Sequence, residues 1–332
     1  MAQMKYFYEL TISSSPHAHS PVTTQTIMRD VLIALVPALL GSIYFFGFRA
    51  LLVTLVNAAA CVFFEWGFCK VRKLHCKTYD LSAVVTGVLL AFVCPVTIPY
   101  WTIILGDFFA IVLVKMLFGG LGKNIVNPAL AGRAFLFSWP VLMSNWVKVG
   151  FDNAAGLLST ADAVTAATPM SAMHQGALPE ESILDMFLGN IGGCIGETSA
   201  LLLIIGFIYL LYRKVITARI PLAYIGTVAI LAFLFPQGND RIAWMAAQVF
   251  GGGLMLGAIF MATDYVTSPL TKLGQIVYGI GCGVITILIR YFGGYSEGVT
   301  YAILCMNACA VLLDKIGRPV KFGAPKKEEA KK

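Results

Sequence analysis

Charged side chains are scarce in this sequence and make up 12% of its 332 residues. Soluble globular proteins carry roughly 25% charged and about 45–50% apolar residues, whereas 58% of this chain is hydrophobic. Apolar runs recur from Val31 to near the C-terminus, and a helix needs about 20 such residues to cross a bilayer. The composition therefore excludes an ordinary soluble enzyme and predicts an all-α integral membrane protein.

Other features are also absent, and each absence excludes a class of protein. Residues 1–30 contain no apolar segment of the kind that a cleavable signal peptide requires. None of the eight cysteines belongs to a Cys-x-x-C pair. An iron–sulfur cluster needs about four clustered thiolates, so we expect these cysteines to be small buried hydrophobic residues. The sequence shows no catalytic triad, no nucleotide-binding domain and no soluble basic face that nucleic acid would bind.

The apolar runs predict ten membrane-spanning helices in two sets of five. The third is short and ends at Pro95, with Pro99 following, which favours a broken or re-entrant segment buried within the protein. The predicted spans are Val31–Phe48, Leu51–Phe68, Leu81–Val96, Trp101–Phe118 and Asn127–Met143, then Thr198–Tyr212, Ile220–Phe235, Ile242–Ala262, Gln275–Tyr291 and Val299–Leu313.

Basic residues indicate how these spans are oriented, because cytoplasmic loops are enriched in Lys and Arg. They gather in the second, fourth, sixth and eighth loops and in the tail, whereas the long fifth loop has one lysine, Lys148, and five acidic residues. We therefore predict that both termini are cytoplasmic. The predicted regions are a cytoplasmic segment 1–30, a first half 31–143, an extracytoplasmic loop 144–196, a second half 197–315 and a basic cytoplasmic tail 316–332.

Two short stretches suggest an internal repeat. Lys115 to Gly120 is similar to Arg290 to Gly294, and each stretch follows the fourth span of a five-span set. Because five is odd, two such halves would lie inverted relative to each other in the membrane, as in many transporters and channels.

The most informative loop segment runs from Asp162 to Met170 and consists mainly of small residues. Pro169 biases Thr168 toward an extended backbone, which would hold its hydroxyl clear of the chain, and the small neighbours leave room for a bulky group. From local chemistry alone, an ordinary surface loop is the favoured interpretation.

This segment resembles the flavin-attachment motif of the family that contains the D subunit of the Rnf complex and the B subunit of the sodium-pumping NADH:quinone reductase. Asp162, Thr165, Ala167 and Thr168 match the motif, and Ala166 stands where the family often has Gly. The resemblance covers nearly the whole chain, and the short N-terminus favours the Rnf subunit. Further stretches similar to the family's motifs are 15–17, 80–87, 119–129, 196–199 and 262–269.

The resemblance implies that a flavin transferase joins FMN through its phosphate to Thr168. It also implies a role in electron transfer between ferredoxin and NAD, coupled to Na⁺ or H⁺ translocation in a prokaryotic plasma membrane. Iron–sulfur and flavin subunits of the complex are the expected partners, besides membrane lipid. A second, non-covalent flavin such as riboflavin, and a fold like that of urea and ammonium channels, are further expectations. The alternatives are a channel or transporter without a redox role, and a scaffold subunit whose motif carries no flavin.

Ionisable residues within or beside the spans are candidates for the ion path, because a charge in the bilayer is costly. Glu65 and Asp107 lie deepest in their runs and are the preferred candidates. The simpler interpretation is that each pairs with a neighbour. No metal site is predicted, since His17 and His19 lack nearby Cys or carboxylate ligands. The further ionisable candidates are Arg133, Asp264 and Glu297.

Overall fold

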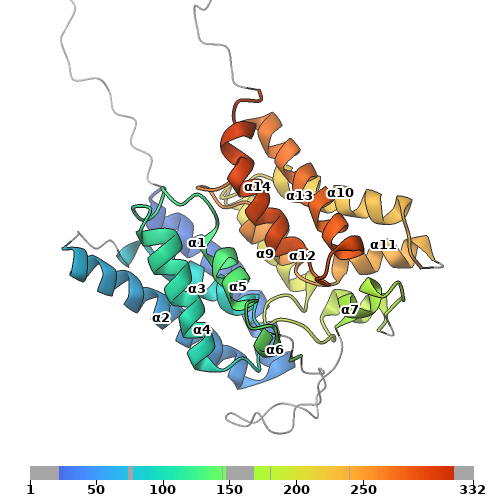
Figure 1. The fold of residues 1–332 in the computed structure, drawn as a ribbon, viewed down its shortest axis with the longest axis horizontal. Helices are drawn as coiled ribbons and strands as arrows, with labels where there is room; N and C mark the ends of the chain where they lie inside the picture. The colour runs from blue at the N-terminus through green and yellow to red at the C-terminus, as the bar shows by residue number, and fades with distance from the viewer. Residues whose placement is uncertain are drawn as a thin grey trace, which may run out of the picture.

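The structure, a computed structural model, describes residues 22–73, 78–143, 145–146, 168–179, 181–238 and 240–317. Its regular elements in these ranges are all helices. They form two groups, one from the first part of the chain and one from the last, which lie side by side (Figure 1). The predicted all-α class is therefore confirmed for the described residues.

The first group contains two long helices joined at Gly47, whose φ of 78° lies in the left-handed region that favours glycine. The next helix packs so tightly on the second long helix that a Cβ at Gly87 would lie 2.7 Å from the Asn57 carbonyl oxygen. The elements are α1 (Thr24–Phe46), α2 (Phe48–Arg72), η1 (Thr78–Asp80), α3 (Ser82–Phe92), α4 (Tyr100–Phe108), the π-helix η2 (Phe109–Met116), α5 (Pro128–Leu136) and α6 (Pro140–Met143).

Two short helices, α7 and α8, connect this group to the second one.

In the second group, Asp240 and Thr271 precede α11 and α13. In each case the side-chain oxygen accepts a hydrogen bond from a backbone N–H of the first turn. The elements are α7 (Pro169–His174), α8 (Ile183–Leu188), α9 (Ala200–Tyr212), α10 (Arg219–Leu234), α11 (Arg241–Phe250), α12 (Leu254–Leu256), the π-helix η4 (Gly257–Met261), α13 (Lys272–Phe292) and α14 (Val299–Leu313).

Each of the ten predicted spans overlaps one helix or a run of consecutive helices. Within the described ranges, α1, α2 and α13 are long and apolar enough to cross a membrane alone. A fourth candidate is a broken span whose first part is α11 and whose second part is α12 with η4. The two parts are bent by 59° relative to each other. The other helices are shorter, so the count of ten spans stays a prediction.

Corresponding helices of the two predicted halves touch each other. α1 packs against α9, and α5 packs against α14. The π-helices, in contrast, belong to the fourth segment of the first half and to the third segment of the second. Two contacts between the halves thus join corresponding segments, whereas the π-helical turns are features of each half separately. The inverted repeat stays a prediction.

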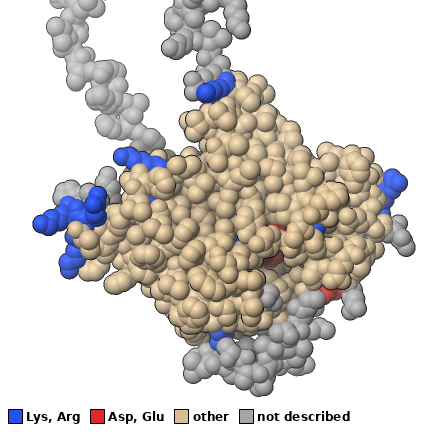
Figure 2. Space-filling model, in the orientation of Figure 1, with Lys and Arg blue, Asp and Glu red and all other residues tan. Residues whose placement is uncertain are grey.

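The molecular surface fits a membrane environment. Large apolar side chains such as Leu40, Ile208 and Leu288 are exposed, and the face in Figure 2 shows Lys and Arg mainly at its edges. In Figure 1 the first and last described residues lie toward the top, whereas α6 and α7 lie toward the bottom. Such a surface is what a protein embedded in lipid presents, since hydrocarbon offers charged groups no solvation.

Candidate functional site

Thr168 lies immediately before α7 and has the extended backbone that the sequence predicts, with φ −74° and ψ 150°. Pro169 takes the first helical position, where its missing N–H costs nothing. The carbonyl of Thr168 accepts hydrogen bonds from the Ser171 N–H at 2.9 Å and the Ser171 hydroxyl at 2.7 Å. Its own side chain makes no capping hydrogen bond, so the hydroxyl is not engaged by the helix that it precedes.

Thr168 borders a cavity of about 590 Å³, a volume that includes the open space at its mouth. The cavity lies where the two groups of helices meet, because it is lined by residues from α5, from the loops before α9 and α14, and from the break after α11. One wall is aromatic: the Phe137 and Tyr295 rings are 5.9 Å apart, and both residues line the cavity with Trp146.

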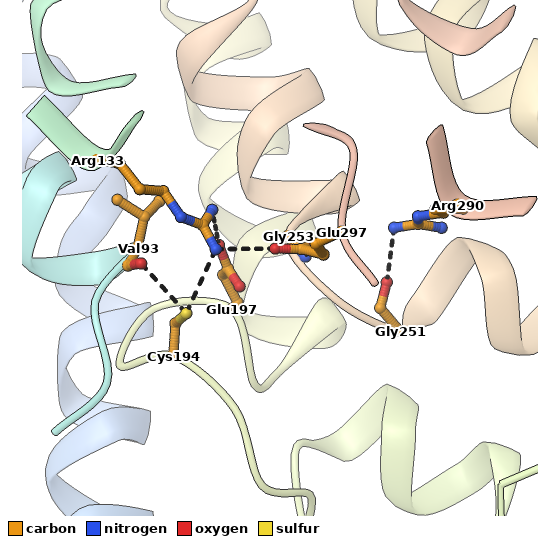
Figure 3. A network of polar contacts seen from close by, with 8 residues as sticks. All are labelled: Val93, Arg133, Cys194, Glu197, Gly251, Gly253, Arg290 and Glu297. Atoms are coloured by element: carbon orange, nitrogen blue, oxygen red, sulfur yellow. Dashed lines mark hydrogen bonds and ion pairs between the residues drawn. The ribbon is translucent and has the colours of Figure 1, made fainter. Parts of the chain in front are cut away.

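Arg133 on α5 is the charged centre of this cavity (Figure 3). One terminal nitrogen donates to Glu197 at 2.9 Å, and the other donates to Glu297 at 2.8 Å. The second nitrogen also lies 3.7 Å from the Cys194 sulfur. Only 2% of Arg133 is exposed, and its Nε has no hydrogen-bond partner among the described residues. A planar guanidinium suits this role because its fork can hold two carboxylates at once.

Glycine residues at the break after α11 complete the same network. Glu297 accepts a hydrogen bond from the Gly253 N–H. Gly252 has a φ of 65°, and a Cβ there would lie 2.5 Å from a Glu297 oxygen. Close approach of this carboxylate therefore requires the missing side chain. In the sequence, the run Gly251-Gly252-Gly253 marks this position. The same run is equally compatible with close helix packing alone.

Glu197 lies in the loop before α9, outside the helical segments. Burial raises its pKa from 4.5 to about 7, against the opposing effect of the Arg133 charge, while the nearby Glu297 charge raises it further. Burial therefore favours the protonated form of this carboxyl group, and the Arg133 charge opposes that effect.

Two further buried arginines donate hydrogen bonds to backbone carbonyl groups where the chain leaves a helix, at the end of α11 and in the loop after α3. Arg290 donates to the Gln248 carbonyl at 2.6 Å and to Gly251 at 3.4 Å, where α11 ends (Figure 3). Arg49 donates to the Val96 carbonyl at 2.8 Å in the segment that follows α3. Neither role was predicted, although a lone arginine within an apolar run is the signal that would have indicated it.

A second polar cluster surrounds Glu65, one of the two preferred ion-path candidates. Lys115 donates to both Glu65 oxygens, at 3.1 and 3.2 Å, and to the Ser82 hydroxyl at 2.7 Å. The Ser82 hydroxyl in turn donates to Asp80 at 2.6 Å. Glu65 therefore pairs with a neighbouring charge, as the simpler interpretation predicts. Arg133 and Glu297 are likewise paired. Lys115 was not identified as a site residue from the sequence. A lysine near the end of an apolar run usually indicates where a membrane span ends.

Asp107, the other preferred candidate, is fully buried and accepts a hydrogen bond from the Cys61 thiol at 3.1 Å. Its second oxygen has no partner within the described part of the chain. Cys61 is one helical turn from Glu65 on α2. Glu65 thus lies on α2 and Asp107 contacts the same helix, although no hydrogen bond between described residues joins their clusters.

The remaining candidates fall in two places. Asp264 lies in the loop after η4 and accepts a hydrogen bond from Thr267 at 3.0 Å, separate from the Arg133 cluster. Asp162, Thr165 and Ala167 of the attachment motif lie outside the described residues.

Comparison with known proteins matches residues 11–323 to the model of the NQR2, RnfD, RnfE family. The chain is 46% identical to the D subunit of the Na(+)-translocating ferredoxin:NAD(+) oxidoreductase complex of Acetobacterium woodii, over 97% of this chain and 98% of that protein. It is 44% identical to the D subunit of the proton-translocating ferredoxin:NAD(+) oxidoreductase complex of Clostridium ljungdahlii, over 94% and 96%. It is 34% identical to the D subunit of the ion-translocating oxidoreductase complex of Actinobacillus succinogenes, over 93% and 96%.

Proposed function

Because the chain belongs to the NQR2, RnfD, RnfE family, we propose that it is the D subunit of an ion-translocating ferredoxin:NAD oxidoreductase (Rnf) complex in a prokaryotic plasma membrane. The similarity to such subunits over nearly the full length of both chains supports this assignment. The chain is not catalytic alone. Electrons reach and leave it through iron–sulfur and flavin subunits, since its own sequence supplies neither kind of domain.

The subunit carries FMN joined by a phosphoester to Thr168, with Asp162, Thr165 and Ala167 as the rest of the motif that a flavin transferase reads. The observation that carries this proposal is the extended Thr168 whose hydroxyl is free of its helix and borders a cavity. When attached, FMN supplies reversible one- and two-electron redox chemistry. A second, non-covalent flavin such as riboflavin belongs to the proposal without an assigned position.

The residues of the cavity fit such a group. The Phe137 and Tyr295 rings offer an aromatic surface for stacking, and the buried guanidinium of Arg133 lines the same cavity with its two carboxylate partners. Glu197, with its raised pKa, can hold or release a proton as the charge in the cavity changes. Binding and charge compensation are therefore the tasks of this chain's own side chains.

Ion translocation is the second part of the proposal, with Glu65 and Asp107 on the ion path. Buried ionisable groups are expensive in a membrane and mark such paths. The relatives leave the coupling ion open, because one whose name specifies sodium and one whose name specifies protons match this chain about equally well, at 46% and 44% identity.

The proposed topology places ten spans in two inverted halves, both termini in the cytoplasm and Thr168 on the outer side. The contacts of α1 with α9 and α5 with α14 support the inverted halves. The ends of the described chain and α7 lie toward opposite sides in Figure 1, which supports the placement of Thr168 across the membrane from the termini.

Activity of the whole complex in membrane vesicles tests the redox role of Thr168. We expect Thr168→Ala to abolish ferredoxin-driven NAD reduction and the ion transport that accompanies it. Thr198→Ala is the matched control, because Thr198 lines the same cavity and should leave both activities in place. Full activity of Thr168→Ala would remove the redox role and favour a channel or a scaffold.

A further inference from the structure

Lys115 and Glu65 stand between two cavities. An open space of about 1660 Å³, here called the vestibule, is lined by Glu65 and Asp80 together with residues from the α1 start and the 119–123 loop. A second cavity, here called the inner cavity, has a volume of about 720 Å³ including the open space at its mouth. It is lined by Lys115 and Ser82 together with Asn124, Asn127 and Asp264. Glu65 thus faces one space and its partner Lys115 faces the other, so the ion pair forms part of the wall between them.

The Lys115 ammonium occupies a position suited to a small monovalent cation. It receives three oxygen atoms, two from the Glu65 carboxylate and one from the Ser82 hydroxyl, at 2.7 to 3.2 Å. Oxygen atoms arranged in this way replace the water that a cation loses when it enters a protein. Asp80 adds a second carboxylate beside Ser82, so the vestibule presents two acidic side chains close to the Lys115 ammonium, with Lys123 elsewhere on its lining.

We propose that Lys115 is a tethered cation that occupies the ion site of Glu65 and closes the passage between the vestibule and the inner cavity. A transported monovalent cation binds Glu65 as the Lys115 ammonium leaves it for the inner cavity. This inference rests on the proposed role of the subunit in ion translocation. It adds the identity of the group that keeps the passage closed.

The inner cavity contains alternative hydrogen-bond partners for the Lys115 ammonium. Asn124 is 7% exposed, lines this cavity, and its side-chain oxygen has no partner among the described residues. Asp264 contributes a carboxylate to the same cavity. The lysine stem has four flexible carbons, which let the ammonium change partners without moving the backbone.

The backbone at Lys115 is also unusual, since it belongs to the π-helix η2. Single π-helical turns are rare and occur frequently at functional sites. The wide turn places Lys115 inside the protein, where it is 1% exposed.

The exchange follows from the cost of an unpaired buried charge. Removing Lys115 from Glu65 leaves a buried carboxylate without a partner, which is strongly unfavourable. A cation arriving from the vestibule removes that penalty, so each departure of Lys115 is linked to the arrival of one cation. Negative charge added near the inner cavity attracts the Lys115 ammonium. It thereby favours the arrangement in which Lys115 has left Glu65 and the passage is open.

Passive cation leak through the complete complex in proteoliposomes tests the proposal. Leak is measured without an electron donor, with ²²Na⁺ for sodium and a pH-sensitive dye for protons. We expect Lys115→Gln to raise the leak of the transported ion about tenfold, which corresponds to about 1.4 kcal/mol of barrier. Lys115→Arg keeps the positive charge and should stay closed. Lys123→Gln is the control, because Lys123 lines the vestibule and the proposal gives it no part in closing the passage.

Two further measurements keep the test decisive. Should Lys115→Gln fail to assemble, Ser82→Ala retains the ion pair, removes the third oxygen, and should raise the leak by a smaller factor. Wild-type leak in every assembled variant would overturn the proposal. Donor-driven transport by the wild-type complex is measured in parallel, so that failure of the proposed function, which abolishes that transport, is distinguished from failure of the Lys115 inference, which does not.

Discussion

Arg133 and Glu297 form an ion pair of 2.8 Å that joins the two groups of helices at the cavity bordered by Thr168. Arg133 comes from α5, and Glu297 comes from the loop before α14. The same arginine holds Glu197 before α9, so one buried side chain connects three segments that are distant in the sequence. The cavity therefore depends on contacts between the halves and not on either half alone.

Replacing Arg133 should destabilise the protein strongly. Arg133→Gln leaves two buried carboxylates without their partner, and breaking a buried ion pair in this way costs about 3–5 kcal/mol. Thermal unfolding in detergent measures the change. Arg219→Gln is the control, because Arg219 is exposed and, among the described residues, donates a hydrogen bond to the Gln275 side chain alone. Such a surface change should alter stability by less than about 0.5 kcal/mol. Equal effects of the two substitutions would contradict the assigned role of Arg133.

The pKa of Glu197 predicts a pH dependence of stability. Because burial raises this pKa from 4.5 to about 7, the folded protein holds a proton that the unfolded chain releases between these values. Stability should therefore fall as the pH rises through this window. Glu197→Gln should reduce that fall, as seen in unfolding temperatures between pH 4.5 and 7. A fall of the same size in the variant would show that other groups cause it.

Gly252 should not tolerate a side chain. Its positive φ and the 2.5 Å distance from a Cβ to Glu297 predict that Gly252→Ala lowers the free energy of unfolding by about 1–3 kcal/mol. Gly226→Ala is the matched control, since a Cβ there meets nothing within 4 Å and alanine favours the helix α10. Equal unfolding temperatures for Gly252→Ala and the wild type would be the contrary result.

Glu65 and Asp107 should affect ion movement more than electron movement. Glu65→Gln and Asp107→Asn are expected to retain NAD reduction by ferredoxin while donor-driven ion transport is lost, because these carboxylates lie far in sequence from the attachment motif and outside the Thr168 cavity. Both rates are measured in the same vesicles. Unchanged ion transport in both variants would remove these residues from the path.

Hydropathy and proline placement were sufficient to locate the helical segments outside the predicted loop 144–196, whereas α7 and α8 within that loop were not predicted. The break after α3, which ends at Phe92 ahead of Pro95, follows from proline chemistry, as does the extended Thr168 before Pro169. These features are local, because each depends on the conformational limits of one proline and its neighbour.

The polar interior was harder to predict, because its residues are brought together by packing across the sequence. Lys115 reads as the end of an apolar run but turns inward on a π-helix to meet Glu65. Arg290 lies in an apolar helix and caps a different helix, α11. Neither periodicity nor composition encodes such a pairing, since each partner alone is compatible with several positions.

Mass spectrometry of the purified subunit tests the central claim most directly. Intact mass and in-gel flavin fluorescence are compared for the wild type, Thr168→Ala and Thr198→Ala, all expressed in cells that contain the transferase. A gain of one FMN less one water in the wild type and in Thr198→Ala, absent from Thr168→Ala, is the result that the proposed attachment predicts. An unmodified wild-type subunit, or a flavin retained by Thr168→Ala, would contradict it.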